Sequence, residues 1–435
     1  MRAVWQFLDS DFEKVEALLH KRRHHLLYAS EGHAAIQYLR SMMTFTREAM
    51  ADAHQAAEST INLASYYRKP RGWHGLKTMT PVQRHAELVH AEAYLLRAMV
   101  NIGMGDGVLA LLKESWHVRS AYATYRNCFA YIQDAYGNGE RLDDHFVSGT
   151  YLGMGVFNLV LSMLPAKLLR FIELVGFTAD RRLGLELLAI AAGWRSDPIH
   201  PCGYGLRSEF CTLVLLGYHV FLCSDLYLGY PNIPLVEVVL RRSLQQHPDG
   251  LLFMYFEARL LILRSDMEGA IQRFGALHVT GGSDWRQLQY LGYWEQSLCL
   301  MALGRWLDAA AGFDVLRREN NWNKAAYTYA LACCLWEHYL GLCGGVAPVD
   351  TAELSNGQRQ VLDVVRSLMA LVPSLKRKVA GKSIPIEKFV IRKAAKFQQQ
   401  GNFLMRPGLE VLHTMNLISK MPRTRLLVLR DEIDR

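Results

Sequence analysis

A ten-residue phrase that recurs along the chain constrains its fold more than any other feature. The copy at Ser265–Phe274 is repeated 39 residues later at Gly304–Phe313, and a weaker copy runs from Ser10 to Leu19. Each copy has a turn-forming residue, then a bulky apolar residue, a small or β-branched residue and a large apolar residue at fixed spacing. This order is typical of the second helix in a helical-hairpin repeat, where the small residue lies at a contact between two helices.

The composition agrees with a repeat built from helices. The chain has 435 residues, which is long for one compact core but ordinary for a solenoid. Apolar residues make up 51% and charged residues 21%, so a large core can be buried. There are only 13 prolines, and apolar residues recur at three- and four-residue spacing rather than in strict alternation. We therefore predict an all-α, tetratricopeptide-like helical-hairpin solenoid, wound as a right-handed superhelix.

Helix-start signals place the helices along the chain. Thr80, Pro81 and Gln83 predict a strong start, and Ser10 with Glu13 predicts a capping box. The expected helices are 2–8, one that ends near 27, then 31–45, 47–66, 80–102, 107–136, 149–164, 166–175, 180–192, 206–229, 234–246, 249–264, 267–279, 285–303, 306–319, 323–343, 355–372, 384–400 and 408–419.

Breaks in this pattern suggest how the chain is divided. The loop at 193–205 contains two prolines and three glycines and is the expected boundary between regions 1–192 and 206–435. The first region includes an unusually apolar hairpin at about 149–176. A single continuous solenoid is the alternative.

The residue patterns of known catalytic and metal sites are not found. His20 and His24 are four apart but lie among cations, and Gly381-Lys382-Ser383 lacks the earlier glycine of a phosphate-binding loop. The eight cysteines show no zinc-knuckle spacing and no signal peptide precedes them, so we expect reduced core thiols. We predict a protein that is not an enzyme, with no catalytic, cofactor-binding or metal site.

Positive charge is concentrated at the C-terminal end. The net charge is +8, yet Leu375–Arg435 holds 14 Lys/Arg and 5 Asp/Glu, a balance of +9. Plain solvation of a basic helix face is the default interpretation, with an anionic partner as the alternative. The candidate anionic-partner patch consists of Lys376, Arg377, Lys378, Arg392, Lys393 and Lys396.

Several phrases resemble one protein family. The segment Thr150–Gly184 closely resembles the central hairpin of the tetratricopeptide-repeat protein 39 family, which includes the fungal inclusion-body clearance proteins. His85–Glu92 resembles the family helix before it, Leu206-Arg207-Ser208 with Cys211 resembles the helix after it, and Trp322–Ala325 resembles a late repeat. The resemblance runs from about Ala3 to Leu417; it departs at a short first helix and an insertion at 196–204.

The resemblance implies a non-enzymatic helical-repeat scaffold in a family associated with lipid and sterol regulation, lipid droplets and aggregate clearance. It brings no catalytic motif. The residues of this chain that match the repeat-contact positions of the family are expected to be structural: Ala258, Ala270, Phe274, Ala309 and Phe313.

We therefore expect an adaptor that binds protein partners in the groove formed by its first helices. The alternative is a lipid-binding or membrane-surface protein that uses the apolar hairpin and the basic C-terminal region. No transmembrane span is expected, because the longest apolar stretch, Phe210–Cys223, is too short to cross a bilayer. No specific nucleic-acid partner is expected either. The expected location is the cytoplasm, with peripheral attachment to membranes or lipid droplets, or entry into the nucleus, left open.

Overall fold

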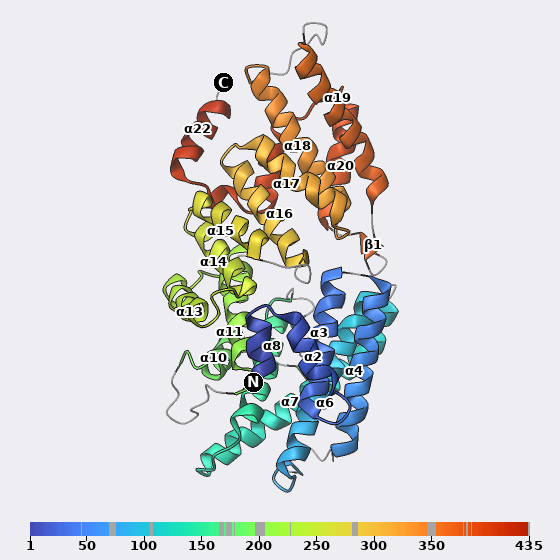
Figure 1. Ribbon diagram of the computed structural model, residues 1–435, viewed down its shortest axis with the longest axis vertical. Coiled ribbons are helices and arrows are strands. Elements are labelled where there is room, and N and C mark those ends of the chain that lie inside the picture. The colour runs from blue at the N-terminus through green and yellow to red at the C-terminus, as the bar shows by residue number, and fades with distance from the viewer. Residues whose placement is uncertain are drawn as a thin grey trace. The chain divides into compact units, whose positions relative to one another are not determined.

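The described chain is helical and falls into two compact units. The computed structural model describes residues 1–44, 46–68, 75–104, 108–164, 169–170, 176–177, 179–195, 205–226, 228–280, 286–345, 354–376, 378–379, 382–383 and 385–433. Contacts divide them into unit 1, Met1–Asn232, and unit 2, Ile233–Arg435. Apart from two very short strands, the regular elements of the described residues in Figure 1 are helices, so the predicted all-α, tetratricopeptide-like solenoid is confirmed.

Unit 1 consists of hairpins followed by a broken helix. Its elements are α1 (Arg2–Leu8), α2 (Phe12–His20), α3 (Leu27–Thr44), α4 (Arg47–Tyr67), α6 (Pro81–Met104), α7 (Val108–Gly137), α8 (Asp144–Leu161), α10 (Arg181–Ala191), α11 (Ser208–Gly217), a π-helical turn (Tyr218–Leu222) and α12 (Cys223–Asp225). The main packed pairs are α3 with α4, α6 with α7 and α8 with α10, and α4 also packs on α6.

Unit 2 continues with hairpins and ends in shorter helices. Its elements are α13 (Ile233–Gln246), α14 (Leu251–Leu263), α15 (Met267–Thr280), α16 (Arg286–Ala302), α17 (Trp306–Glu319), α18 (Lys324–Leu342), α19 (Asn356–Leu371), a 3₁₀ turn (Val372–Leu375), strands β1 (Lys378–Val379) and β2 (Lys382–Ser383), α20 (Pro385–Gln399), α21 (Pro407–Thr414), a 3₁₀ turn (Ile418–Lys420) and α22 (Arg423–Ile433). The two strands pair antiparallel, with Lys378 opposite Ser383 and Val379 opposite Lys382.

The recurring phrase forms the same turn each time. Ser10, Ser265 and Gly304, the first residues of the three copies, all have a positive φ, at 65°, 62° and 76°. In the second copy, the amide of Ser265 donates to the carbonyl of Ile262, and the next amide donates to the carbonyl of Leu261. The other two copies have the same pair of bonds, which caps the preceding helix and starts the next one at once.

The apolar positions of the phrase face the interior. The small or β-branched positions are Val15, Ala270 and Ala309, which are 2%, 0% and 0% exposed. The large positions Phe274 and Phe313 are also 0% exposed. The phrase thus buries the small or β-branched position in all three copies and the large position in the two stronger copies.

The predicted helix starts have mixed outcomes. The capping box at Thr80 is confirmed, because Thr80 Oγ1 accepts from the amide of Gln83 and Gln83 Oε1 accepts from the amide of Thr80. The box at Ser10 and Glu13 is wrong: Asp11 caps α2 by accepting from the amide of Lys14, while Ser10 lies in the preceding turn.

Several predicted boundaries also differ. The helix expected to end near 27 stops at His20, where the chain turns before α3. The helix expected to begin at Gly149 begins at Asp144, because the side chain of Asp143 caps it. The helix expected at 206–229 is interrupted by the π-helical turn, and the one expected at 408–419 ends at Thr414, with α22 following it. The second helix of the apolar hairpin, at 166–175, falls largely outside the described residues.

The boundary between the units lies after Asn232 rather than in the loop at 193–205. The region from Leu206 onward belongs to unit 1 because α11 packs on α8 and α10. Arg207, just before α11, also pairs with Glu92 of α6.

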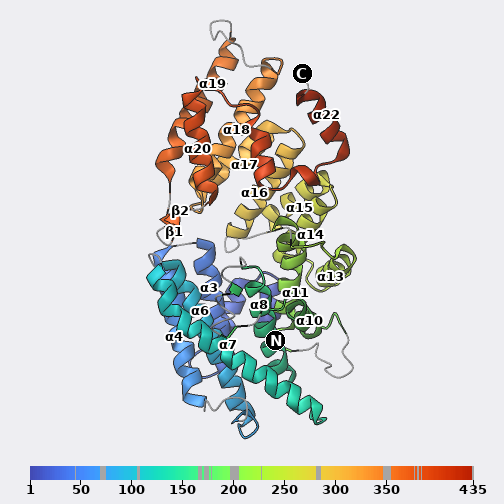
Figure 2. The ribbon, with the colours of Figure 1, turned by 180° about the vertical axis from the view of Figure 1, so that it is seen from behind.

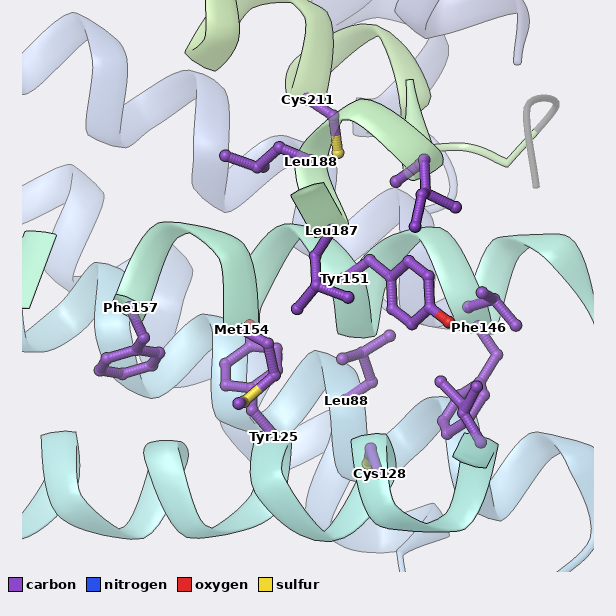
Figure 3. Close-up of a cluster of buried hydrophobic side chains, with 14 of the residues drawn as sticks. Leu88, Tyr125, Cys128, Phe146, Tyr151, Met154, Phe157, Leu187, Leu188 and Cys211 are labelled. Carbon is purple, nitrogen blue, oxygen red and sulfur yellow. The ribbon is translucent and has the colours of Figure 1, made fainter. Parts of the chain in front are cut away.

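The core of unit 1 packs around α8, as Figure 3 shows for Tyr151, Met154 and Phe157 beside Tyr125 of α7. Glycines allow this close packing. A Cβ added at Gly153 would lie 1.9 Å from Tyr125 Cε1, and a Cβ at Gly155 would lie 2.6 Å from Leu188 Cγ. The glycines of this segment therefore serve helix packing, as their place in an apolar helix predicts.

Candidate functional site: the inner faces of the hairpins

The candidate binding surface is formed by the first helix of each hairpin. In unit 2 these first helices are α14, α16 and α18, and the second helices are α15, α17 and α19. We call the side of the first helices that the second helices leave uncovered the inner face. In helical-repeat proteins such a face is the one that binds extended ligands.

On the inner face of unit 2 lies a segment of the chain itself. Helix α21 packs against α16 and α18, two successive first helices. Figure 2 shows the red C-terminal helices running from α20 on one side of α18 to α22 on the other. Residues Phe403–Gly408 connect α20 to α21 and contact α18, and we call this segment the tail contact.

Two side chains of α18 hold the tail contact by its main chain. The indole Nε1–H of Trp336 donates to the carbonyl of Leu404 at 2.9 Å. The carboxylate of Glu337 accepts from the amide of Gly408 at 3.0 Å. Trp336 and Glu337 are each 2% exposed, so both contacts lie in the interior.

An arginine completes the contact. Arg406 Nη1 donates to Glu337 Oε2 at 2.9 Å, and its Nη2 donates to Glu432 of α22 at 2.6 Å. Arg425 also donates to Glu432, at 2.9 Å. The chain of charges Glu337, Arg406, Glu432 and Arg425 thus ties α18 to the last helix.

The backbone at Arg406 adopts an unusual conformation. Arg406 has φ 46° and ψ 53°, in the left-handed region that residues other than glycine, asparagine and aspartate rarely adopt. It directly precedes Pro407, the first residue of α21. Such a conformation persists where the surroundings determine it, and here the contacts are those of Arg406 with Glu337 and Glu432.

Burial raises the pKa of the Glu337 carboxyl, while Arg406 and the amide of Gly408 act in the opposite direction. The two hydrogen-bond donors therefore offset part of the cost of removing this carboxylate from water. Without them, the site would hold an uncompensated buried acid.

Another buried ion pair joins the first helices of unit 2. Arg259 of α14 donates to Glu295 of α16 at 2.8 Å, and the hydroxyl of Tyr255 lies 3.4 Å from the same carboxylate. The side chains of Arg259 and Glu295 are 3% and 10% exposed. This ion pair holds α14 against α16, two of the helices that form the inner face.

Unit 1 has a similar arrangement at its first helices, α3, α6 and α8. Arg207, the residue before α11, pairs with Glu92 of α6 through two hydrogen bonds, and its Nη2 lies 3.5 Å from Glu31 of α3. Its guanidinium lies 4.8 Å from the ring centre of Tyr28. A Cβ at Gly149 of α8 would lie 2.9 Å from Arg207 Cδ, so glycine there makes room for the arginine.

The repeat-contact residues predicted from the sequence all lie in the interior of unit 2. Each of the five is 0% exposed: Ala258, Ala270, Phe274, Ala309 and Phe313. Phe274 packs its ring 5.7 Å from that of Tyr255, and Phe313 packs its ring 5.6 Å from that of Trp294. They are core residues between hairpins and do not contribute to a binding surface.

The predicted basic patch is only partly brought together. Lys376, Arg392 and Lys396 are exposed, whereas Lys393 forms an ion pair with Glu410 of α21. Arg377 and the side chain of Lys378 lie outside the described residues. Lys393 therefore serves the docking of α21 rather than an external anion.

Metal and thiol chemistry have no visible site in the described part of the chain. None of its groups of His, Cys, Asp and Glu could hold a metal ion. Its cysteines are free, and burial raises the pKa of the Cys128 and Cys299 thiols, which keeps them protonated and unreactive. Within the same residues, each helix is either too short or too polar to cross a bilayer.

Sequence reasoning missed the tail contact. The site residues predicted from the sequence do not include Trp336, Glu337 or Arg406. A signal was present for Glu337, which is a lone acid in the apolar run Ala325–Leu342. A charged residue in such a run needs a buried partner, although the sequence does not say which residue supplies it.

The comparisons with known proteins agree with this architecture. The model of the family Iml2/Tetratricopeptide repeat protein 39 matches residues 1–432. The chain is 28% identical over 409 residues to Tetratricopeptide repeat protein ttc-39B of Caenorhabditis elegans, an alignment that covers 92% of this chain and 67% of that protein. No solved structure matches the chain. The chain belongs to the Iml2/Tetratricopeptide repeat protein 39 family.

Proposed function

We propose that this protein is a non-enzymatic scaffold or adaptor that binds protein partners on the inner faces of its hairpins. One observation carries the proposal: the inner face at α16 and α18 already holds a peptide segment. The Trp336 indole donates to the main-chain carbonyl of Leu404, and the Glu337 carboxylate accepts from the main-chain amide of Gly408 and from Arg406. These are the kinds of contact by which helical-repeat proteins take extended or helical ligands.

Affinity capture from a detergent-free lysate tests the proposal, with proteins and lipids in the eluate identified together. The variant for comparison is Phe313→Asp, because it places a charge at a fully buried position of the repeat. Leu307→Asp is the matched control, since Leu307 lies on the same helix and is 51% exposed.

A protein partner recovered in stoichiometric amount by the parent chain and by Leu307→Asp, but not by Phe313→Asp, supports the adaptor function. Recovery of lipid without a protein partner contradicts it. Equal recovery by all three chains also contradicts it, because binding would then not depend on the folded repeats.

Binding to an anionic membrane surface is the second candidate function. Its support is the exposure of Lys376, Arg392 and Lys396 in the basic C-terminal region. The apolar hairpin supports it less, because most residues of α8 are buried in the unit 1 core. Salt-sensitive binding to anionic liposomes that is lost when Lys376, Arg377 and Lys378 are neutralised would favour this function, and salt-insensitive or absent binding would exclude it.

A further inference from the structure

The tail contact has the character of a bound ligand. Its residues Leu404 and Gly408 are recognised through a carbonyl and an amide, which every peptide of suitable shape can offer. Arg406 supplies the side-chain contact to Glu337. Trp336 and Glu337 of α18 therefore recognise one arginine side chain and two main-chain groups near it, rather than a full amino-acid sequence.

We propose that Asn402–Ile433, the tail, is a built-in occupant of the unit 2 inner face, and that the external partner is a peptide of the same chemistry. Such a peptide offers a backbone carbonyl, an arginine two residues later and the first amides of a helix immediately after the arginine. It displaces the tail by taking its place on Trp336 and Glu337. This inference rests on the proposed function, because it names the ligand chemistry of the same surface.

The fit at α21 explains why the residue after Arg406-Pro407 is small. A Cβ at Gly408 would lie 2.8 Å from Glu337 Cγ and 3.0 Å from Trp306 Cζ3. A competing peptide therefore needs glycine at the position two residues after its arginine, because a side chain there would overlap Glu337 and Trp306.

The link between the tail and the rest of unit 2 is a surface turn. Gly401 and Asn402 have φ of 72° and 66°, and Gly401 is exposed at the end of α20. Through this short link the tail has an effective concentration on the order of millimolar at its site. A free peptide can compete only weakly until the link is cut.

The test uses the full chain with a protease site inserted between Gln400 and Gly401. The protein is folded intact, cut at that site, and mixed with an excess of a labelled synthetic peptide that spans residues 402–435. Exchange of the labelled peptide into the cut protein is followed by fluorescence anisotropy, and the helical content of the large fragment is followed by circular dichroism.

We expect the labelled peptide to exchange in while the large fragment stays folded. A peptide with Arg406→Ala should bind about ten- to hundredfold more weakly, because it loses charge-assisted hydrogen bonds to a buried carboxylate. A peptide with Arg430→Ala is the matched control and should bind like the parent, because Arg430 is 64% exposed and pairs with its neighbour Asp431. Trp336→Phe in the large fragment should weaken every peptide, since it removes the indole donor.

Two results would overturn the proposal. If the large fragment loses its helical signal whenever the tail leaves, the tail is an essential part of the core and not an occupant. If the Arg406→Ala and Arg430→Ala peptides bind equally well, the arginine contact does not select the ligand.

These outcomes are separable from those of the capture experiment. Peptide exchange without any captured partner would leave the tail as an occupant and remove the adaptor function. A captured partner with no exchangeable tail would keep the adaptor function and place its binding elsewhere.

Discussion

Arg207 and Glu92 are 115 residues apart in the sequence, yet they are joined by two hydrogen bonds inside unit 1. The pair Arg406 and Glu337 repeats this relationship in unit 2. In both cases the arginine is the residue before a helix and the glutamate belongs to the first helix of a hairpin. The same device thus anchors a later segment of the chain on a first helix in each unit.

Glu92 gives unit 1 a specific pH dependence. Burial raises the pKa of its carboxyl, although Arg207 opposes the shift. Between the pKa of Glu92 in the unfolded chain and its raised pKa in the folded protein, the folded protein holds a proton that the unfolded chain has lost, so the free energy of unfolding falls as pH rises. We predict a contribution of up to about 1.4 kcal/mol per pH unit, measured by urea unfolding from pH 5 to pH 8.

Glu92→Gln isolates this contribution because glutamine does not titrate. The stability of the parent chain relative to Glu92→Gln should increase as pH falls from 8 to 5. Parallel stability curves for the two chains would show that Glu92 is ionised throughout this range.

Because α7 packs closely on α8, adding even a methyl group at Gly153 should lower the free energy of unfolding. Gly153→Ala should destabilise the protein by about 2 kcal/mol, because the new methyl group would overlap the Tyr125 ring. Gly341→Ala in α18 is the control: a Cβ there meets nothing within 4 Å, so it should be neutral or stabilise by up to about 1 kcal/mol. Denaturant midpoints measure both, and equal effects would argue against this helix contact.

The register of the repeats predicts a larger effect at Phe313. Phe313→Asp should lower the free energy of unfolding by roughly 4 kcal/mol or more, because it buries a charge and removes an aromatic ring from the core. Leu307→Asp, at an exposed position of the same helix, should change it by less than about 0.5 kcal/mol. If Phe313→Asp unfolds at the same urea concentration as the parent, the assigned register is wrong.

Much of the fold could be predicted from the sequence because the repeat signals are local. Ser265 and Gly304 mark turns, and the spacing from Ala309 to Phe313 marks a helix face, so short segments suffice. The start of α2 was misplaced because Asp11, next to Ser10, takes the cap, and the start of α8 was misplaced because Asp143 caps the helix well before Gly149.

The site could not be predicted in the same way because its contacts are not local. Glu337 and Arg406 are 69 residues apart in the sequence. The residues around Arg406 show no repeat or helical spacing that would indicate a buried contact. The predicted basic patch failed to account for Glu410, which takes Lys393 as its partner. Charge counts along the sequence do not reveal which cations are already paired in the fold.

The central claim is that partners bind on the inner face, and hydroxyl-radical footprinting of the captured complex tests it most directly. Phe403 and Met405, which flank Leu404 in the tail contact, are 42% and 78% exposed. Leu307 of α17 and Val364 of α19, on the second helices, are 51% and 48% exposed. We predict that the partner changes the oxidation rates of Phe403 and Met405, by covering or displacing them, and leaves Leu307 and Val364 unchanged. Protection of Leu307 and Val364 with no change at Phe403 and Met405 would contradict the account.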